Sequence, residues 1–224
     1  MHYTFQFGEV LQHWNELLTG AAITLVVAFI SFWIGCVIGL LGALAEQHAR
    51  SGVKKLVRGY VIFFTNTPSL IQIFVLFYGL PDFGIVLSPL TAVLTGLSLN
   101  AGAYLTDIMR SGLISVSKTE LEAAQTLNLS AWQSFRYVTL PHIAKTIYPV
   151  LSNFFIWILL GSSIGGLFGV NELTGAVIDI SSTTFRSIEA FSVAAGMYVI
   201  LTFIASAMLY GVGYWCFRVR ARFI

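Results

Sequence analysis

Five long apolar stretches run through this 224-residue sequence, and they limit what the chain can fold into. A helix needs about 20 mostly apolar residues to cross the hydrocarbon core of a bilayer. Hydrophobic residues make up 57% of the chain and charged residues only 10%, a composition typical of a protein with several membrane spans. The predicted spans are residues 18–45, 60–79, 88–108, 146–168 and 191–216. The sequence therefore predicts an all-α membrane protein with five transmembrane helices.

The basic residues predict which side of the membrane each loop faces. Lysine and arginine are enriched in cytoplasmic loops, and all of them except Arg186 fall in loops that alternate spans place on one side. These residues are Arg50, Lys54, Lys55, Arg58, Arg110, Lys118, Arg136, Lys145, Arg218, Arg220 and Arg222. The expected arrangement is an extracytoplasmic segment 1–17, a transmembrane domain 18–216 and a basic cytoplasmic tail 217–224. The N-terminus would lie outside and the C-terminus in the cytoplasm.

A polar segment at residues 117–141 interrupts this apolar chain on the predicted cytoplasmic side. Residues 117–120 and 130–133 fit capping boxes, in which a serine and a Glu or Gln three residues later satisfy free amide groups at a helix start. Between them, Asn128 suits the left-handed conformation that ends a helix. Pro141 stops the second helix or starts a new one, because proline fits only the first turn. The segment is therefore predicted to be helix, sharp turn, helix.

The same segment resembles the EAA motif of permease subunits in binding-protein-dependent ABC importers. The matching residues are Glu122, Ala123, Ala124, Asn128, Val138, Leu140 and Pro141. All spacings agree, with Asn128 in place of the usual glycine and Val138 in place of isoleucine. In that family the loop docks on a cytoplasmic ATPase and transmits its closure to the membrane helices. The residues alone leave open a second interpretation, an amphipathic loop that rests on the bilayer through Trp132 and Phe135.

Three further segments are similar to the polar amino-acid branch of this family, so that the resemblance covers nearly the whole chain. They are residues 63–81, 103–124 and 169–191. The resemblance implies the type I permease fold of ABC importers, and alternating access in the inner membrane of a bacterium. It also implies the partners: a second permease chain, two cytoplasmic ATPase subunits that hold ATP and Mg, an extracytoplasmic solute-binding protein, and membrane lipid.

Other classes of function find little support in the sequence. The phosphate-binding pattern Gly-x-x-x-x-Gly-Lys-Ser/Thr is missing from the 224 residues, so ATP hydrolysis is expected on a partner and no cofactor on this chain. A net charge of +2 gives no reason to expect nucleic acid as a partner. Two alternatives stay open, a permease of the same fold for another small solute and a stand-alone channel or secondary carrier. The carrier is disfavoured because all acidic residues can be placed at or beyond span ends.

Polar residues beside two prolines indicate a path for the solute. Asn66, Thr67 and Gln72 flank Pro68 in the second span, and Ser162 and Ser163 follow Pro149 late in the fourth. Broken helices with polar neighbours line transport sites because their freed backbone groups face a cavity. Simple kinks that neighbouring helices accommodate are the alternative.

Two charged positions that are common in the amino-acid branch are missing here. Thr65 stands where that branch often has arginine, and Leu160 and Gly161 stand where it often has a Lys-Asp pair. Ionised groups inside a membrane are costly and usually functional. Their absence predicts either a site of neutral groups or, as the favoured hypothesis, a heterodimer in which a different permease chain carries the charges.

Two more spacings give local predictions. Gly35, Gly39 and Gly42 form a stripe of small residues on the first span, which predicts close helix packing and leaves a dimer seam open. Asp107 and Arg110 are three residues apart near the inner end of the third span, so they are expected to pair with each other.

Overall fold

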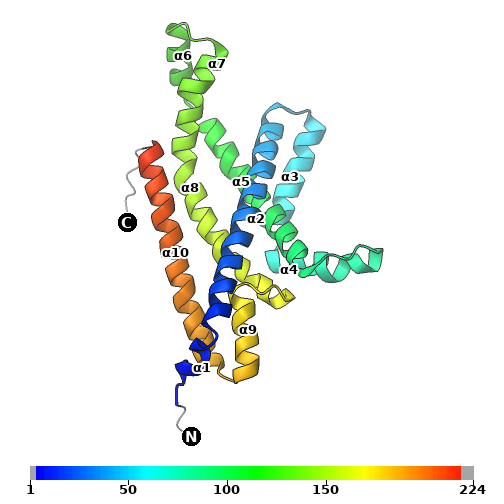
Figure 1. Cartoon of the computed structure of the whole chain (residues 1–224). Helices are drawn as coiled ribbons and strands as arrows, with labels where there is room; N and C mark the ends of the chain where they lie inside the picture. The colour runs from blue at the N-terminus through cyan, green and yellow to red at the C-terminus, as the bar shows by residue number, and fades with distance from the viewer. Residues whose placement is uncertain (1–3, 218–224) are drawn as a thin grey trace.

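The computed structural model describes residues 4–217, and within that range it contains helices and loops but no strand (Figure 1). The prediction of an all-helical chain is confirmed. The α-helices are α1 (Phe7–Leu11), α2 (Trp14–His48), α3 (Ser51–Thr65), α4 (Ser69–Phe74), α5 (Pro89–Ser115), α6 (Lys118–Thr126), α7 (Ala131–Ser134), α8 (Leu140–Gly161), α9 (Leu173–Thr184) and α10 (Ser187–Phe217). Residues 218–224, which hold most of the predicted basic tail, lie outside the described residues.

Three helices in the described range are long and apolar enough to cross a membrane by themselves. They are Trp14–His48, Ala131–Phe168 and Ser187–Phe217, and the bent pair Ser51–Thr65 with Ser69–Phe83 makes a fourth if it is one span. The predicted third span forms the 27-residue helix α5, which is about 40 Å long. This helix is long enough to cross a membrane but more polar than the three named above. Its polar residues Ser98, Asn100 and Thr106 are buried among other helices, where they avoid lipid. The count of five spans and the sides of the termini remain predictions.

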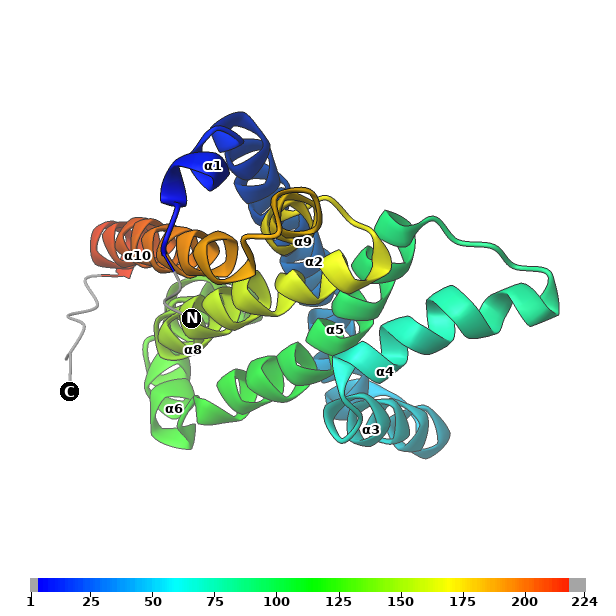
Figure 2. The same ribbon diagram turned by 90° about the horizontal axis from the view of Figure 1, so that it is seen from below.

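The second predicted span is not one straight helix. It breaks between Thr65 and Ser69, and the direction of the helix changes there by 103°. Pro68 lacks an N–H and disfavours helical backbone at Thr67, which explains why the helix ends here. Seen from below, α4 and the segment after it project away from the other helices (Figure 2). Pro149, in contrast, stays inside α8.

The glycine stripe of α2 packs against α5 within the same chain. A Cβ atom at Gly35 would lie 2.7 Å from the Ala101 Cβ, and one at Gly39 would lie 2.6 Å from the Leu105 Cβ. Such distances are shorter than any normal contact, so these positions need glycine for the two helices to approach. The packing interpretation of the stripe is confirmed.

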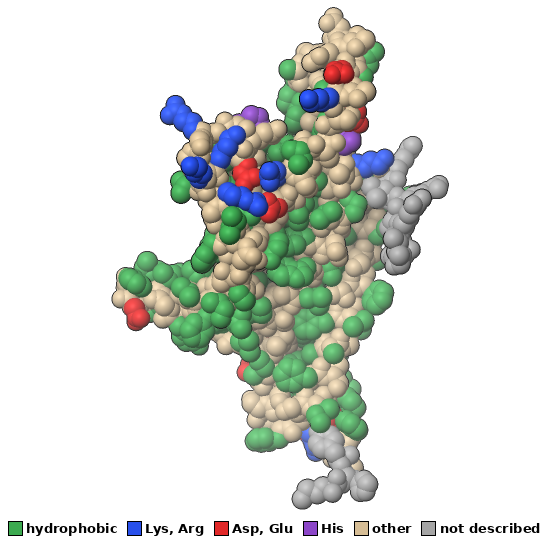
Figure 3. Space-filling view, turned by 180° about the vertical axis from the view of Figure 1, so that it is seen from behind, with side chains coloured by type: hydrophobic (Ala, Val, Ile, Leu, Met, Phe, Trp, Pro, Cys, Tyr) green, Lys and Arg blue, Asp and Glu red, His purple; other side chains and the backbone are tan. Residues whose placement is uncertain are grey.

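The predicted pair between Asp107 and Arg110 is wrong, because each side chain reaches a different neighbouring helix. An Asp107 carboxylate oxygen lies 2.9 Å from the guanidinium of Arg58 on α3. The Arg110 guanidinium lies 3.0 Å from Glu46 on α2. The two pairs connect α5 to both helices near the end of the molecule where Lys and Arg side chains gather (Figure 3).

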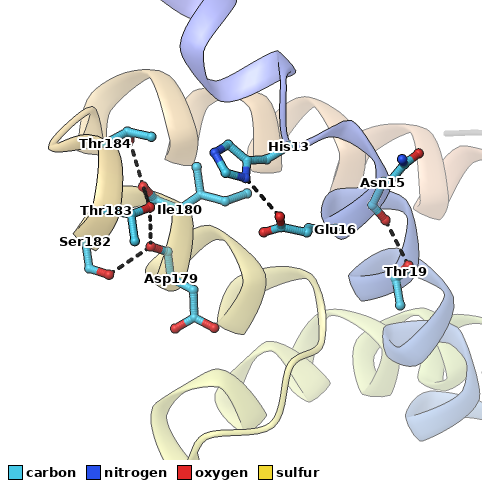
Figure 4. A network of polar contacts seen from close by, with 9 residues as sticks. All are labelled: His13, Asn15, Glu16, Thr19, Asp179, Ile180, Ser182, Thr183 and Thr184. Atoms are coloured by element: carbon cyan, nitrogen blue, oxygen red, sulfur yellow. Dashed lines mark hydrogen bonds and ion pairs between the residues drawn. The ribbon is translucent and has the colours of Figure 1, made fainter.

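The opposite end of the molecule carries α1, α9 and the start of α10 (Figure 1). In the last turns of α9, the hydroxyls of Ser182, Thr183 and Thr184 donate to the carbonyls of Asp179 and Ile180 within the same helix (Figure 4).

At the start of α9, Glu172 is fully buried, although it belongs to a predicted outer loop. Its carboxylate accepts hydrogen bonds from Thr24 of α2 at 3.1 Å, Tyr198 of α10 at 2.8 Å and the Gly175 N–H at 3.0 Å. These hydrogen bonds connect the start of α9 to the long helices α2 and α10.

Candidate coupling loop and solute pocket

The polar segment 117–141 stands at the end of the molecule opposite α1 and α9, at the top of Figure 1. Both predicted capping boxes are present. The Glu120 N–H donates to the Ser117 hydroxyl at 3.2 Å, and the Ser117 N–H donates to the Glu120 carboxylate at 3.1 Å. The reciprocal bonds between Ser130 and Gln133 are 3.3 and 2.9 Å long. The helix–turn–helix prediction is confirmed.

Asn128 makes the turn between α6 and α7. Its φ of 57° is in the left-handed region, which an L-residue adopts at a cost. The conformation lets the Asn128 N–H reach the Gln125 carbonyl at 2.8 Å and the Leu129 N–H reach the Ala124 carbonyl at 3.1 Å. The last carbonyls of α6 are thereby satisfied, as in other left-handed helix ends.

Most of the surface of this loop has no partner in the described chain. Ala124 is buried with 2% of its surface exposed, but Glu122 and Ala123 beside it are exposed. Large apolar side chains are also open, with Leu127 73% and Trp132 70% exposed. A loop that is well ordered by its caps yet presents both acidic and apolar groups fits a surface that another protein covers.

The second helix of the loop continues into the membrane helix without a break. Residues Ala131–Phe168 form one helical run, in which a π-helical turn at Phe135–Thr139 leads into α8. The wider turn lets the Leu140 N–H reach the Phe135 carbonyl, and Pro141 sits in the first turn of α8. Pro141 therefore lies at the start of an α-helix, as predicted. The chain before it is also helical, so the run Ala131–Phe168 is not interrupted there.

One side-chain contact ties α6 to the same helix. The Nδ1 of His142 lies 3.0 Å from Oε1 of Glu120, which also belongs to the first capping box. The hydrogen bond from the Ser117 N–H is the main cause that lowers the pKa of Glu120, and the nearby His142 adds to it. The carboxylate form of Glu120 is thus the form that this structure favours.

A pocket of about 400 Å³ opens at the break between α3 and α4. It is lined by Thr65, Asn66, Thr67, Pro68, Ser69, Leu70, Asn100, Tyr104, Trp157 and Ile164. The structure thus brings the sequence-predicted Asn66 and Thr67 together with three residues that the sequence analysis missed, Asn100, Tyr104 and Trp157. The visible signal was Asn100, an uncharged polar residue among apolar and small residues in a predicted span.

Side chains from neighbouring segments hold the broken end of α3. The amide nitrogens of Asn100 and Gln72 both donate to the Phe64 carbonyl at 3.0 Å, and Gln72 also donates to the Thr67 carbonyl at 2.9 Å. The Tyr104 hydroxyl donates to the Thr65 carbonyl at 3.1 Å. These bonds replace the ones that the helix loses at its end, which stabilises the break. Gln72 is a support for the pocket and lies outside its lining.

The predicted serines of the fourth span lie near the pocket but do not line it. Ser162 is buried and donates to the Leu159 carbonyl at 2.8 Å. It begins a 3₁₀ segment, Ser162–Phe168, that also contains Ser163 and from which Ile164 contributes to the pocket wall.

Comparison with known proteins identifies the family. Residues 35–212 match the family described as binding-protein-dependent transport system inner membrane component. The chain is 31% identical to the nopaline transport system permease protein NocM of Agrobacterium fabrum, over 92% of this chain and 90% of that protein. It is 32% identical to the probable amino-acid ABC transporter permease protein YckA of Bacillus subtilis, over 91% and 90%.

A solved structure agrees with this result. The crystal structure of an amino acid ABC transporter with histidines is similar with a TM-score of 0.88 and 30% identity, covering 95% of this chain and 100% of that one. The fold, the family match and the relatives together lead to one assignment. The chain belongs to the binding-protein-dependent transport system inner membrane components, and it is therefore a permease subunit of an ABC importer rather than an enzyme.

Proposed function

We propose that this chain conducts polar amino acids across the inner membrane by alternating access, driven by ATP hydrolysis on a separate subunit. The names of two relatives support this substrate class, since one is a probable amino-acid permease and the similar solved structure is an amino acid transporter. The structural observation that carries the proposal is the continuous helical run Ala131–Phe168. It begins in the exposed loop and ends in the 3₁₀ segment that contributes Ile164 to the pocket wall.

The proposed topology has five spans, with the N-terminus outside and the C-terminus in the cytoplasm. In this arrangement residues 1–17 are extracytoplasmic, residues 18–216 form the permease domain, and residues 217–224 form a cytoplasmic tail. The gathering of Lys and Arg at the end that bears the loop supports this orientation (Figure 3). The bent pair α3–α4 and the polar helix α5 would supply the second and third spans.

Segment 117–141 is proposed as the coupling loop that docks on the ATPase. Its proposed contact and turn residues are Glu122, Ala123, Ala124, Asn128, Leu140 and Pro141. The exposure of Glu122 and Ala123 supports a docking role. The small side chain of Ala123 allows a partner to approach closely, and the carboxylate of Glu122 offers a charge for it to contact. ATP and Mg would be bound by that partner.

The pocket at the α3–α4 break is proposed as part of the solute path. Asn66 and Thr67 would contact the solute, and Gln72 would keep the broken helix in place. Ser162 and Ser163 would belong to the solute path through the adjoining 3₁₀ segment, whose Ile164 is part of the pocket wall.

We also propose a heterodimer of two different permease chains, with two ATPase subunits and an extracytoplasmic solute-binding protein. Among the described residues that line the pocket there is no Lys, Arg, His, Asp or Glu. A zwitterion needs both of its charges satisfied when it leaves water, so a partner chain with charged groups would complete the site. The projecting arm from α4 onward exposes Phe74, Val75 and Tyr78, which offer apolar contact area for such a partner.

Affinity purification of this chain from its native cells, followed by mass spectrometry, tests the assembly. The expected complex contains a second permease of different sequence and an ATPase. After reconstitution with the binding protein, this complex should take up a polar amino acid in an ATP-dependent way. A complex that holds this permease as a homodimer would reject the heterodimer. A failure to transport any amino acid while another small solute is taken up would reject the substrate class.

A further inference from the structure

Basic side chains cluster at the corner where α2 turns into α3. They are Arg50, Lys54, Lys55 and Arg58. Two residues, Ala49 and Arg50, separate the helices, so these charges are held on a short corner. Figure 3 shows Lys and Arg side chains gathered at this flank of the molecule. The corner therefore presents a compact region of positive charge.

Two of the four basic side chains are used inside the chain. The Lys54 Nζ donates to the Gln47 carbonyl at 3.0 Å and so connects the start of α3 to the end of α2. The Arg58 guanidinium lies 2.9 Å from the Asp107 carboxylate on α5. These two contacts hold the corner and the helix that follows it in place.

The other two, Arg50 and Lys55, are exposed and make no hydrogen bond or ion pair within the part of the chain that the structure describes. Glu46 on the α2 side of the corner is paired with Arg110 at 3.0 Å, so it does not neutralise them. The general enrichment of basic residues in cytoplasmic loops accounts for the sign of these charges. It does not determine on which face of α3 they lie.

The exposed face of α3 changes from basic to apolar along the helix. Residues three and seven positions apart share one face, so Lys55, Arg58 and Ile62 form a row. Lys55 and Arg58 are exposed at its start, and Ile62 is 51% exposed at its far end. Leu56 and Phe63 form a second row beside it and are 75% and 59% exposed. The change takes place over about 10 Å, which is two helical turns.

This arrangement matches the boundary between lipid headgroups and acyl chains. Apolar side chains face hydrocarbon there, while lysine and arginine lay their stems along it and keep their charges among the headgroups. Basic residues just cytoplasmic of a membrane span attract anionic lipids. Gly59 lies between Lys55 and Ile62, and a Cβ atom at Gly59 would meet nothing within 4 Å. An acyl chain therefore has room to lie along α3 at this point.

A soluble protein partner matches the same surface less well. Figure 1 shows α6 and α7 of the coupling loop extending farther from the centre of the molecule than the α2–α3 corner. A partner docked on that loop meets the loop first. Ile62 and Phe63 continue the exposed surface away from the corner, toward the middle of the molecule, and a soluble partner at the corner would leave them uncovered.

We propose that the α2–α3 corner binds an anionic phospholipid of the cytoplasmic leaflet. Arg50 and Lys55 pair with its negative headgroup, and its acyl chain lies along Gly59 and Ile62. The inference goes beyond the proposed transport function, and it uses the proposed orientation only to name the leaflet.

Quenching of a fluorophore by spin-labelled lipids tests the proposal with the assembled permease–ATPase complex in nanodiscs. Cys36 and Cys216 are replaced by alanine, and Gly59→Cys carries a bimane fluorophore. The nanodiscs consist of phosphatidylcholine with an increasing fraction of a lipid that bears a nitroxide near the top of one acyl chain. This labelled lipid is phosphatidylglycerol in one series and phosphatidylcholine in the other.

Two double variants separate the corner from the total charge of the protein. Arg50→Gln with Lys55→Gln removes the two side chains that have no partner in the described chain. Lys118→Gln with Arg136→Gln is the matched control, because it removes two exposed charges from the coupling loop.

Labelled phosphatidylglycerol should reach half-maximal quenching at a mole fraction about fivefold lower than labelled phosphatidylcholine. Arg50→Gln with Lys55→Gln should reduce this difference to less than about twofold, and the control variant should keep it. Added salt should also reduce the difference, since it screens exposed charges.

Equal quenching by the two lipids would overturn the lipid preference, and so would a preference that the Arg50 and Lys55 changes leave intact. Quenching by neither lipid would show that this face of α3 does not border the bilayer. If the fluorescence then responded to removal of the ATPase, the corner would be a protein contact, and the proposal would be overturned in favour of that partner.

Discussion

The imidazole of His142 lies 3.0 Å from the carboxylate of Glu120, and this contact joins two parts of the chain that the polar loop separates. Glu120 belongs to the first turn of α6, and His142 belongs to the first turn of α8. Helix α6 is therefore connected to α8 in two ways, along the chain through the Asn128 turn and directly through this pair.

Replacing Glu120 with Gln should loosen α6 without unfolding the chain. Glutamine can keep the bond to the Ser117 N–H, but it loses the charge that attracts a protonated His142. Amide hydrogens of residues 118–126 should then exchange faster with solvent, and transport should fall. Hydrogen-exchange mass spectrometry of the reconstituted complex measures the first effect, and unchanged exchange in α6 would contradict the role of the pair.

This stabilisation should depend on pH in a defined direction. The folded protein holds the pKa of Glu120 below its ordinary value of 4.5, so the carboxylate stabilises the loop fully above that value. The contribution is lost as the pH falls through the lowered pKa. The difference in α6 exchange between wild type and Glu120→Gln should thus be present at neutral pH and vanish in stronger acid.

Charge reversal at Glu122 tests docking on the ATPase. Glu122 is exposed and makes no side-chain hydrogen bond or ion pair in the described structure, so Glu122→Lys should not disturb folding. Transport and receptor-stimulated ATPase activity should collapse while the chain inserts at normal levels. Asp82→Lys makes the same reversal at an exposed site on the α4 arm and should leave the stimulated ATPase activity intact. Normal transport by Glu122→Lys would reject the coupling role.

The left-handed turn at Asn128 gives a prediction about stability. Glycine adopts a φ of 57° without the strain of a side chain, so Asn128→Gly should be neutral or stabilising by at most about 1 kcal/mol. Asn128→Val should be destabilising by about 1–2 kcal/mol, because a branched side chain suits this backbone poorly. Thermal unfolding of the purified complex compares the two variants, and a more stable valine variant would refute the turn.

These local features could be predicted because their partners are close in sequence. Ser117 and Glu120 are three residues apart, and the turn at Asn128 depends on its own backbone. The pocket and the ion pairs depend on contacts between distant residues instead. Asn100 meets Phe64 across 36 positions and Asp107 meets Arg58 across 49. Such pairs follow from how α5 is rotated against α3, and a hydropathy pattern does not fix that rotation. Because this rotation could not be predicted, the pairing of Asp107 with Arg110 was predicted incorrectly.

The close approach of α2 to α5 should tolerate no added methyl group. Gly39→Ala would bring a Cβ within 2.8 Å of the Leu105 backbone carbon, and overpacking of this kind costs about 1–3 kcal/mol. At Gly196 on α10, an added methyl would have no atom of the described chain within 4 Å, so Gly196→Ala serves as the control. The melting temperature of the complex should fall for Gly39→Ala and stay close to wild type for Gly196→Ala. The opposite order would reject this packing.

Accessibility of single cysteines checks the proposed orientation. Thr119 near the start of α6 and Ser182 near the end of α9 are both exposed and lie at opposite ends of the molecule. In a protein without Cys36 and Cys216, Thr119→Cys should react with a membrane-impermeant maleimide only from the cytoplasm. Ser182→Cys should react only from outside. Reaction of both from one side would exclude the five-span arrangement.

The helical run from Ala131 to Phe168 is roughly 57 Å long. A flexible linker would absorb a displacement at Trp132 before it reached the membrane, but no stretch of non-helical chain lies in between. We therefore expect a displacement of the exposed end to be carried along the helix toward Ile164. The exposed surface of the loop and the part of the pocket wall formed by Ile164 are thus two ends of one helical run, so we expect a movement of the loop to reach the pocket.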